Sequence, residues 1–370
     1  MQAAQHLDAL RETVPRHEWR ARAETEWERW RAALEWALGK QGNILLGQRL
    51  VGALETAWWV FPEDDARHWV RAAFERADEM TPRNVLARLN LALARQRMQH
   101  HRFKSCHKAA ERALAQARAT GDELGIARAE FLAGHSLVVL GQRAEGEKLL
   151  QSALTRFRKA GAPRSIGRTL ASLALAREHA DDIPAARSLC TEAVEALKAI
   201  EGDDGEPDHV SYLAELEFQA GNAKQALRLI GEALMRHRKL NDSLHVIVDL
   251  SNTAAYLIAL DRYDEARARA REALELALQE KNALWTAFAL QHLATVAALQ
   301  GDAAGAARLI GYVDARVAEL QHEREHTEQG EHERVMIVLR KELSEGELER
   351  LGAEGRAWGE ERAVEQATSR

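Results

Sequence analysis

The stretch GQRAEGEKLLQSALTRF, residues 141–157, contains the pattern that decides the fold of this chain. It begins with a glycine suited to a tight turn and places two further small residues at Gly146 and Ala153. Its apolar residues keep helical spacing, and Leu150 and Phe157, two turns apart, fall on one stripe. The stretch therefore predicts a turn followed by an amphipathic helix, and its small residues allow a second helix to pack closely against it.

The same pattern returns with a period of 40 residues. The first set of small residues is Ala94, Gly134, Ala174, Ala214, Ala254 and Ala294, and the second, twelve residues later, is Cys106, Gly146, Ala186, Ala226, Ala266 and Ala306. The third set is Ala113, Ala153, Ala193, Ala233, Ala273 and Val313, and the turn position holds His101, Gly141, Asp181, Gly221, Asp261 and Gly301. Each unit is thus a helical hairpin. Because one hairpin cannot bury its own apolar face, the hairpins are expected to stack into an all-α, right-handed α–α superhelix.

The spacing of the small residues resembles the tetratricopeptide repeat (TPR), with a unit longer than the usual length of about 34 residues. We expect N-terminal capping helices in residues 1–45, a solenoid of six or seven hairpins in 46–320, and a C-terminal helical tail in 321–370. Seven of the nine tryptophans lie within the first 70 residues. They indicate either a capping helix that covers the end of the solenoid or a docking face for another domain.

Composition excludes several classes of protein. The 370 residues carry a formal net charge of −6 with both signs well mixed, so nothing favours direct binding to nucleic acid. No apolar run is long enough for a membrane span. Two cysteines are too few for a disulfide framework, and we expect a cytoplasmic protein. Gly141 and Gly146 imitate a phosphate-binding loop, but the required Gly-Lys-Ser/Thr ending and the preceding strand are missing.

Both ends of the chain resemble the helical-repeat region of bacterial STAND or NB-ARC type signal-transduction ATPases. The matching residues near the start are Arg31, Ala32, Ala33, Leu34, Trp36, Ala37 and Leu38, and those near the end are Arg308, Leu309, Gly311, Glu354, Gly355, Arg356 and Ala357. The resemblance implies the sensor arm of a signalling or transcription regulator. It also implies an ATPase or DNA-binding module that accompanies this arm in cis or in trans.

Catalytic chemistry finds little support. His322, His326 and His332 lie in a very polar segment without a full ligand set, so we expect no metal site and no cofactor. Cys106 and Cys190 occupy core positions of helices and are expected to be inert. We therefore expect a non-enzymatic interaction module. The alternatives are a stand-alone scaffold or oligomerisation protein and a metal-dependent enzyme.

The first helices of such hairpins line a concave groove, and one lining position carries arginine in three successive repeats. In register this position reads Arg88, Arg128, Arg168, Asp208, Val248 and Phe288. Arginines at successive steps can hold carboxylates or phosphates, which predicts an acidic protein segment or an anionic small effector as the ligand. The expected binding residues are Arg88, Arg95, Arg128, Phe131, His135, Arg168 and Phe218. Pairing of these arginines with acidic residues of the chain itself is the alternative.

Overall fold

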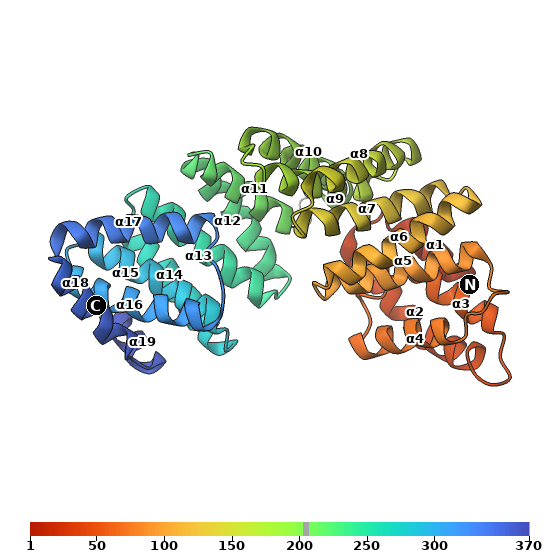
Figure 1. The fold of residues 1–370 in the computed structure, drawn as a ribbon, viewed down its shortest axis with the longest axis horizontal. Coiled ribbons are helices and arrows are strands. Elements are labelled where there is room, and N and C mark those ends of the chain that lie inside the picture. Colours follow the sequence, from red (N-terminus) through yellow and green to blue (C-terminus); the bar gives the residue numbers. More distant parts are fainter. Residues whose placement is uncertain (203–206, 370) are drawn as a thin grey trace. The chain divides into compact units, whose positions relative to one another are not determined.

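The computed structural model describes residues 1–202 and 207–369, which contain 19 helices and no strand (Figure 1). The expected all-α, TPR-like superhelix is confirmed. The first helices of the six hairpins are α5 (Arg83–Gln99), α7 (Glu123–Val139), α9 (Pro163–Glu178), α11 (Pro207–Gln219), α13 (Ser243–Ala259) and α15 (Ala283–Leu299). The second helices are α6 (Phe103–Thr120), α8 (Arg143–Ala160), α10 (Ile183–Glu201), α12 (Ala223–Lys239), α14 (Tyr263–Gln279) and α16 (Ala303–Glu319). Most helices therefore begin at the 40-residue spacing that the sequence predicts.

The small residues mark where the two helices of a hairpin come closest. A Cβ atom on Gly134 of α7 would lie 2.9 Å from the carbonyl oxygen of Gly146 in α8, and one on Gly146 would lie 2.8 Å from the carbonyl oxygen of Gly134. Both distances are too short for real contacts. In the other hairpins the corresponding alanines are fully buried. The recurring small residues are thus required by close backbone contact, as the period predicts.

The turn positions share one backbone conformation. His101, Asp181 and Asp261 have φ of 53°, 60° and 58°, and the glycines at the equivalent positions have φ between 81° and 97°. This left-handed conformation ends the helix and allows the next backbone amide to donate a hydrogen bond to a carbonyl of the last helical turn. Gln142 N, for example, donates to Leu137 O at 2.8 Å. His101 thus adopts a left-handed conformation like the glycines, although it carries a side chain.

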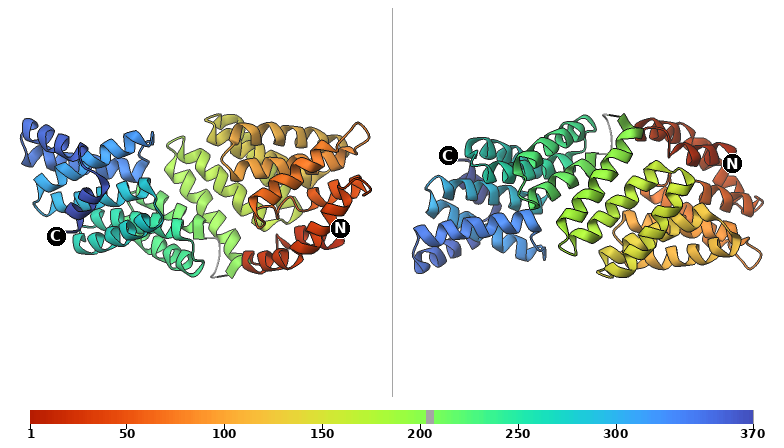
Figure 2. Two further views of the ribbon diagram at one scale, coloured as in Figure 1. Left: turned by 90° about the horizontal axis from the view of Figure 1, so that it is seen from below. Right: turned by 90° about the horizontal axis from the view of Figure 1, so that it is seen from above.

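The chain divides into two compact units, Met1–Glu206 (unit 1) and Pro207–Arg370 (unit 2), each of which is described by itself. The sequence did not predict this division. The expected boundaries near residues 45 and 320 remain predictions. Figure 2 shows the helical pairs of each unit stacked in chain order.

Unit 1 begins with α1 (Gln2–Leu10), α2 (Arg16–Ala37), α3 (Ile44–Ala53) and α4 (Glu63–Glu75), and the tryptophans gather here. Trp19, Trp30 and Trp58 are buried, and Trp27 stacks on Phe61 with ring centroids 4.1 Å apart. These rings form the core that joins α1 and α2 to the first hairpins. Four of the seven tryptophans are therefore buried within unit 1, whereas Trp36 is 60% exposed, and the capping role stays a prediction.

Unit 2 ends with α17 (His326–Glu342), α18 (Glu345–Arg356) and α19 (Glu360–Thr368). α18 packs very closely on α16, because a Cβ atom on Gly355 would lie 1.8 Å from the carbonyl oxygen of Arg308. The Arg308 side chain also donates a hydrogen bond to the carboxylate of Glu354 at 2.7 Å. The two C-terminal segments that resemble STAND regulators thus contact each other, and their glycines have a packing reason.

Candidate functional site

The first helices of unit 1 are crossed by the start of the chain, residues 1–16, which we call the N-terminal segment. One Asp8 carboxylate oxygen accepts a hydrogen bond from Arg128 of α7 at 3.0 Å, and the other accepts from Thr56 at 3.1 Å. Arg88 of α5 lies 3.6 Å from the same carboxylate. An acidic side chain of the protein itself therefore already contacts two of the predicted arginines.

Glu55, directly after α3, forms the buried centre of this cluster. Arg95 donates to one of its carboxylate oxygens at 2.7 Å, and Arg128 donates to the other at 3.0 Å. Glu55 is fully buried, and Arg95 and Arg128 are only 5% and 3% exposed. Burial alone raises the pKa of Glu55, but the positive charges of Arg95, Arg128 and Arg88 lower this pKa to about 2. The cluster is a paired, desolvated charge network, in which loss of one partner leaves a buried charge.

The N-terminal segment continues from this cluster onto α9. Glu12 accepts from the backbone amide of Ser165 at 3.0 Å and from its hydroxyl at 2.7 Å. Arg164 donates to the carbonyl oxygens of Arg11 and Val14 at 2.6 and 2.8 Å. Burial and the nearby guanidinium groups of Arg95 and Arg168 lower the pKa of Arg11 to about 9. Carboxylates and backbone carbonyls of the segment are thus bound step by step along α5, α7 and α9.

These contacts correct the expected open arginine groove. Arg95 and Arg128 do not face solvent, because Glu55 and Asp8 cover them, so the alternative of internal pairing holds for both. Arg88 and Arg168 keep intermediate exposure, and Arg88 also lies 3.9 Å from Asp122. Whether these arginines bind a partner stays a prediction.

Phe131 and His135, two further predicted binding residues, contact each other in unit 1. Phe131 is buried and stacks on His135 at 6.2 Å, while His135 lies 3.1 Å from the hydroxyl of Ser172 on α9. Burial and the charge of Arg168 lower the pKa of His135 to about 4, so it is neutral at pH 7. Phe218, the remaining predicted residue, belongs to unit 2, where it stacks on Tyr256 at 4.4 Å.

Unit 2 is also covered along its first helices, by α17. Thr327 donates to Glu215 of α11 at 2.5 Å, and Gln291 of α15 donates to the carbonyl oxygen of Glu328 at 2.8 Å. Glu331 lies 2.5 Å from Nδ1 of the buried His292. Gln291 and His292 are fully buried, so α17 covers this part of the first helices.

The pKa of Glu328, which lies in this covered surface, is strongly raised. It is 5% exposed, and burial raises its pKa to about 7. Glu215 and Glu325 add to the rise, and His292 opposes it. The attachment of α17 therefore contains a carboxyl group that titrates near neutrality.

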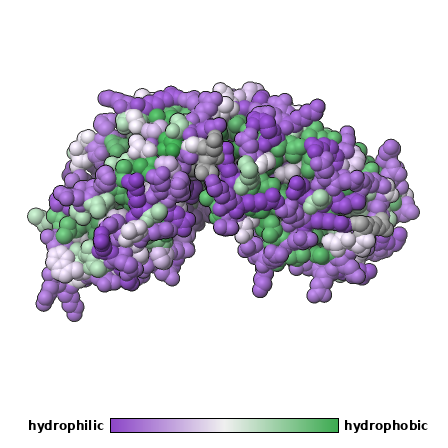
Figure 3. Space-filling view, turned by 180° about the vertical axis from the view of Figure 1, so that it is seen from behind, coloured by the Kyte–Doolittle hydropathy of each residue, from purple (hydrophilic) through white to green (hydrophobic). Residues whose placement is uncertain are grey.

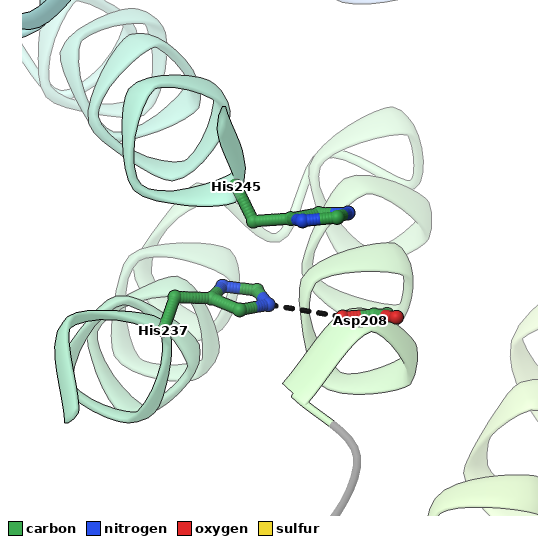
Figure 4. A group of neighbouring side chains, drawn as sticks. All are labelled: Asp208, His237 and His245. Atoms are coloured by element: carbon green, nitrogen blue, oxygen red, sulfur yellow. Dashed lines mark hydrogen bonds and ion pairs between the residues drawn. The ribbon is translucent and has the colours of Figure 1, made fainter. Parts of the chain in front are cut away.

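A further cluster lies where α11 begins, α12 ends and α13 begins. The side chains of Asp208, His237 and His245 converge there from the three helices (Figure 4). One potential metal-ligand atom of each lies within 4.8 Å of the others, and no other such cluster occurs in residues 1–202 and 207–369. Burial lowers the pKa of His237, but its bonds to Asp208 and Asp249 outweigh this and raise it to about 9.

Sequence reasoning missed this cluster. The one signal in the sequence is Asp208, which follows the three arginines at the lining position and breaks their series. His237 and His245 are eight residues apart on different helices, a spacing that matches no metal motif. The histidines that the sequence did single out lie elsewhere, with His322 beside Phe288 at 5.9 Å and His332 beside Asp314 at 3.0 Å.

The two cysteines lie in the interior of the protein. Cys106 and Cys190 are buried, and burial raises the pKa of both, to about 12 for Cys190. On the face drawn in Figure 3, hydrophilic side chains surround smaller apolar patches. None of the described helices combines the length and apolarity that a membrane crossing needs.

Comparisons with known proteins support the architecture. No family model and no curated protein matches the sequence. Among solved structures, the chain is similar to the Cut9–Hcn1 hetero-tetramer of APC/C, with a TM-score of 0.59, 13% identity, and coverage of 90% of this chain and 54% of that one. It is similar to a Rap protein in complex with competence and sporulation factor, with a TM-score of 0.55, 12% identity, and coverage of 92% and 99%.

A third similar structure is a STAND protein with a tetratricopeptide repeat sensor from Pyrococcus horikoshii. The TM-score is 0.56 at 14% identity, and the match covers 88% of this chain and 53% of that one. At these identities the likeness concerns the fold. The chain is a TPR-like α–α solenoid that resembles the repeat sensor of a STAND regulator.

Proposed function

We propose that the chain is a protein-interaction and effector-sensing module of a bacterial signalling or transcription regulator, and that its ligand is an acidic segment of a protein partner. The ligand binds the first helices of unit 1 at the surface that the N-terminal segment occupies. The alternative ligand is an anionic small effector, whose negative charges would bind the same arginines. In this proposal the module acts by binding its ligand and not by catalysing a reaction.

The observation that carries this proposal is the mode in which the N-terminal segment is held. Arg128 binds Asp8 and Ser165 binds Glu12, from two successive first helices. Arg164 binds the backbone carbonyls of Arg11 and Val14, on either side of Glu12. Charged side chains fix the carboxylates, and hydrogen bonds to the backbone fix the path of the segment. A partner segment with two carboxylates at similar spacing finds the same donors once the N-terminal segment leaves.

The regulatory setting rests on resemblance. The end segments that resemble STAND regulators, and the TPR sensor of the Pyrococcus horikoshii STAND protein, favour a role as a sensor arm. A Rap protein of similar fold has been solved in complex with competence and sporulation factor, which supports a binding role for a solenoid of this kind. An ATPase or DNA-binding module, in cis or in trans, is the expected partner of such an arm.

The test uses the N-terminal segment as its own probe. A fluorescent synthetic peptide of residues 1–16 is titrated against the full chain and against an Asp8→Asn, Glu12→Gln double variant, whose own segment is held less firmly. We expect the double variant to bind the peptide at least tenfold more tightly than the wild type, because the intramolecular competitor is weakened. Binding should also weaken as salt is added.

Two controls separate specific binding from general attraction. A peptide that carries Asn and Gln at the positions of Asp8 and Glu12 should bind at least tenfold more weakly. An Arg88→Gln substitution in the double variant should also reduce affinity, since the Arg88 side chain is about 30% exposed and lies 3.6 Å from Asp8. Equal binding of the acidic and the neutral peptide, or no binding to the double variant, would contradict the proposal.

A further inference from the structure

The corner between α12 and α13 places two histidines beside one carboxylate. His237 lies in the last turn of α12 and His245 in the first turn of α13, and Asn241 between them has a left-handed φ of 53° that reverses the chain. Asp208 reaches the same corner from the first turn of α11. Three helix ends thus bring three potential ligands together, and this juxtaposition depends only on unit 2.

The distances in this cluster are close to those of a metal centre. Nε2 of His237 lies 3.0 Å from a carboxylate oxygen of Asp208, and the ligand atoms of all three residues lie within 4.8 Å of one another. Zn–N bonds of about 2.0 to 2.1 Å in tetrahedral geometry require ligand atoms about 3.3 Å apart. The rings of His237 and His245 are stacked with centroids 4.9 Å apart, so His245 reaches that distance only after its side chain rotates out of the stack. Its side chain is only partly buried, which leaves room for this rotation.

Each histidine is oriented by a carboxylate on its other nitrogen. Nδ1 of His237 lies 2.7 Å from Asp249, and Nδ1 of His245 lies 2.9 Å from Asp242. Asp249 is itself fixed by a hydrogen bond from Ser211 at 2.7 Å. Carboxylates in this position hold the proton on Nδ1 and direct the Nε2 lone pair to a metal, as in many zinc proteins. Both histidines have this arrangement, which a simple ion pair between His237 and Asp208 does not require.

We propose that Asp208, His237 and His245 bind one divalent transition metal ion, with Zn²⁺ as the expected occupant. Two imidazoles and one carboxylate favour zinc over magnesium or calcium, which prefer oxygen ligands. Asp208 is exposed at this corner, so water completes the coordination. The ion replaces the proton on Nε2 of His237, and binding therefore releases that proton to solvent. Metal binding links the start of α11 to the corner of α12 and α13.

The full chain is first treated with a chelator and then titrated with CoCl₂, whose visible absorption reports four-coordinate binding, and with ZnCl₂ in a calorimeter at pH 7.5. We expect one equivalent of each ion per chain, displacement of Co²⁺ by Zn²⁺, and a higher melting temperature with Zn²⁺. The Asp208→Asn and His245→Gln variants should each weaken Zn²⁺ binding at least tenfold. Both side chains are partly exposed, so these substitutions preserve the fold better than a change of the buried His237.

His322→Gln is the matched control, because His322 is also partly buried but lies outside the cluster. It should bind Zn²⁺ as the wild type does. Absence of stoichiometric binding to the wild-type chain would overturn the proposal. So would unchanged affinity in both Asp208→Asn and His245→Gln, since the ion would then be held by other residues.

Discussion

The carboxylate of Asp8 in α1 lies 3.0 Å from the guanidinium group of Arg128 in α7, 120 residues further along the chain. This contact joins the N-terminal segment to the first helices of unit 1. Since Arg128 also binds the buried Glu55, the segment is attached to a charge network inside the unit and not to an exposed ion pair.

Asp8→Asn should lower the free energy of unfolding by about 1 to 3 kcal/mol, because Arg128 keeps its burial but loses one of its two charged partners. The change is measured by urea unfolding, together with the rate of proteolysis within residues 1–16, which should rise. Glu24→Gln is the control, since Glu24 pairs with Arg20 at the surface with both side chains about half exposed. Its effect should stay within about 0.5 kcal/mol. Equal effects of the two substitutions would show that the contact with Arg128 stabilises no more than a surface pair.

Glu55→Gln should destabilise unit 1 by about 3 to 5 kcal/mol at pH 7, because it leaves Arg95 and Arg128 buried without their shared carboxylate. The pKa of Glu55 is about 2 in the folded protein, against an ordinary value of 4.5. Its stabilising contribution is therefore complete above about pH 5 and is lost as the pH falls towards 2. Urea unfolding of wild type and variant at several pH values should show the difference between them shrinking below about pH 4. A difference that stays constant from pH 7 to pH 3 would contradict a charged Glu55.

Glu328→Gln should raise the free energy of unfolding above neutral pH, whereas Glu55→Gln lowers it. The folded protein holds the proton of Glu328 more tightly than the unfolded chain, since the pKa is raised from 4.5 to about 7. This group therefore lowers stability as the pH rises from about 4.5 to 7, and the neutral glutamine removes that penalty. At pH 8 the variant should be more stable by on the order of 1 to 3 kcal/mol, and at pH 4.5 the two proteins should be equal. Glu333→Gln, at an exposed position of the same helix, should show no such pH dependence.

Gly355→Ala should destabilise unit 2 by about 1 to 3 kcal/mol, because the added methyl group collides with the backbone of α16. Gly231→Ala is the matched control, and it should change the stability in the opposite direction. Gly231 lies inside α12 with no atom within 4 Å of an added Cβ, so alanine should stabilise the helix by about 0.5 to 1 kcal/mol. Thermal or urea unfolding of both variants measures the two effects. If both substitutions changed the free energy of unfolding in the same direction, the close contact between α16 and α18 would be contradicted.

The sequence by itself determined the helical hairpin and its period. Gly146 and Ala153 follow from the need for close helix contacts, and Gly141 marks a left-handed turn. These features are local, since helical spacing and backbone conformation involve residues only a few positions apart. The repetition of one local pattern then predicts stacking, because an isolated hairpin leaves its apolar face exposed.

Only the tertiary structure decided what covers the first helices and where polar side chains converge. Arg128 shows the difference, because its place in the 40-residue register predicted a basic surface, but its partners Asp8 and Glu55 lie 120 and 73 residues away. Asp208, His237 and His245 likewise meet only because three helix ends share one corner of unit 2. The period of a solenoid specifies how each hairpin packs on its neighbour. It does not specify where the non-repeating ends of the chain bind, because those contacts depend on side chains brought together by the completed stack.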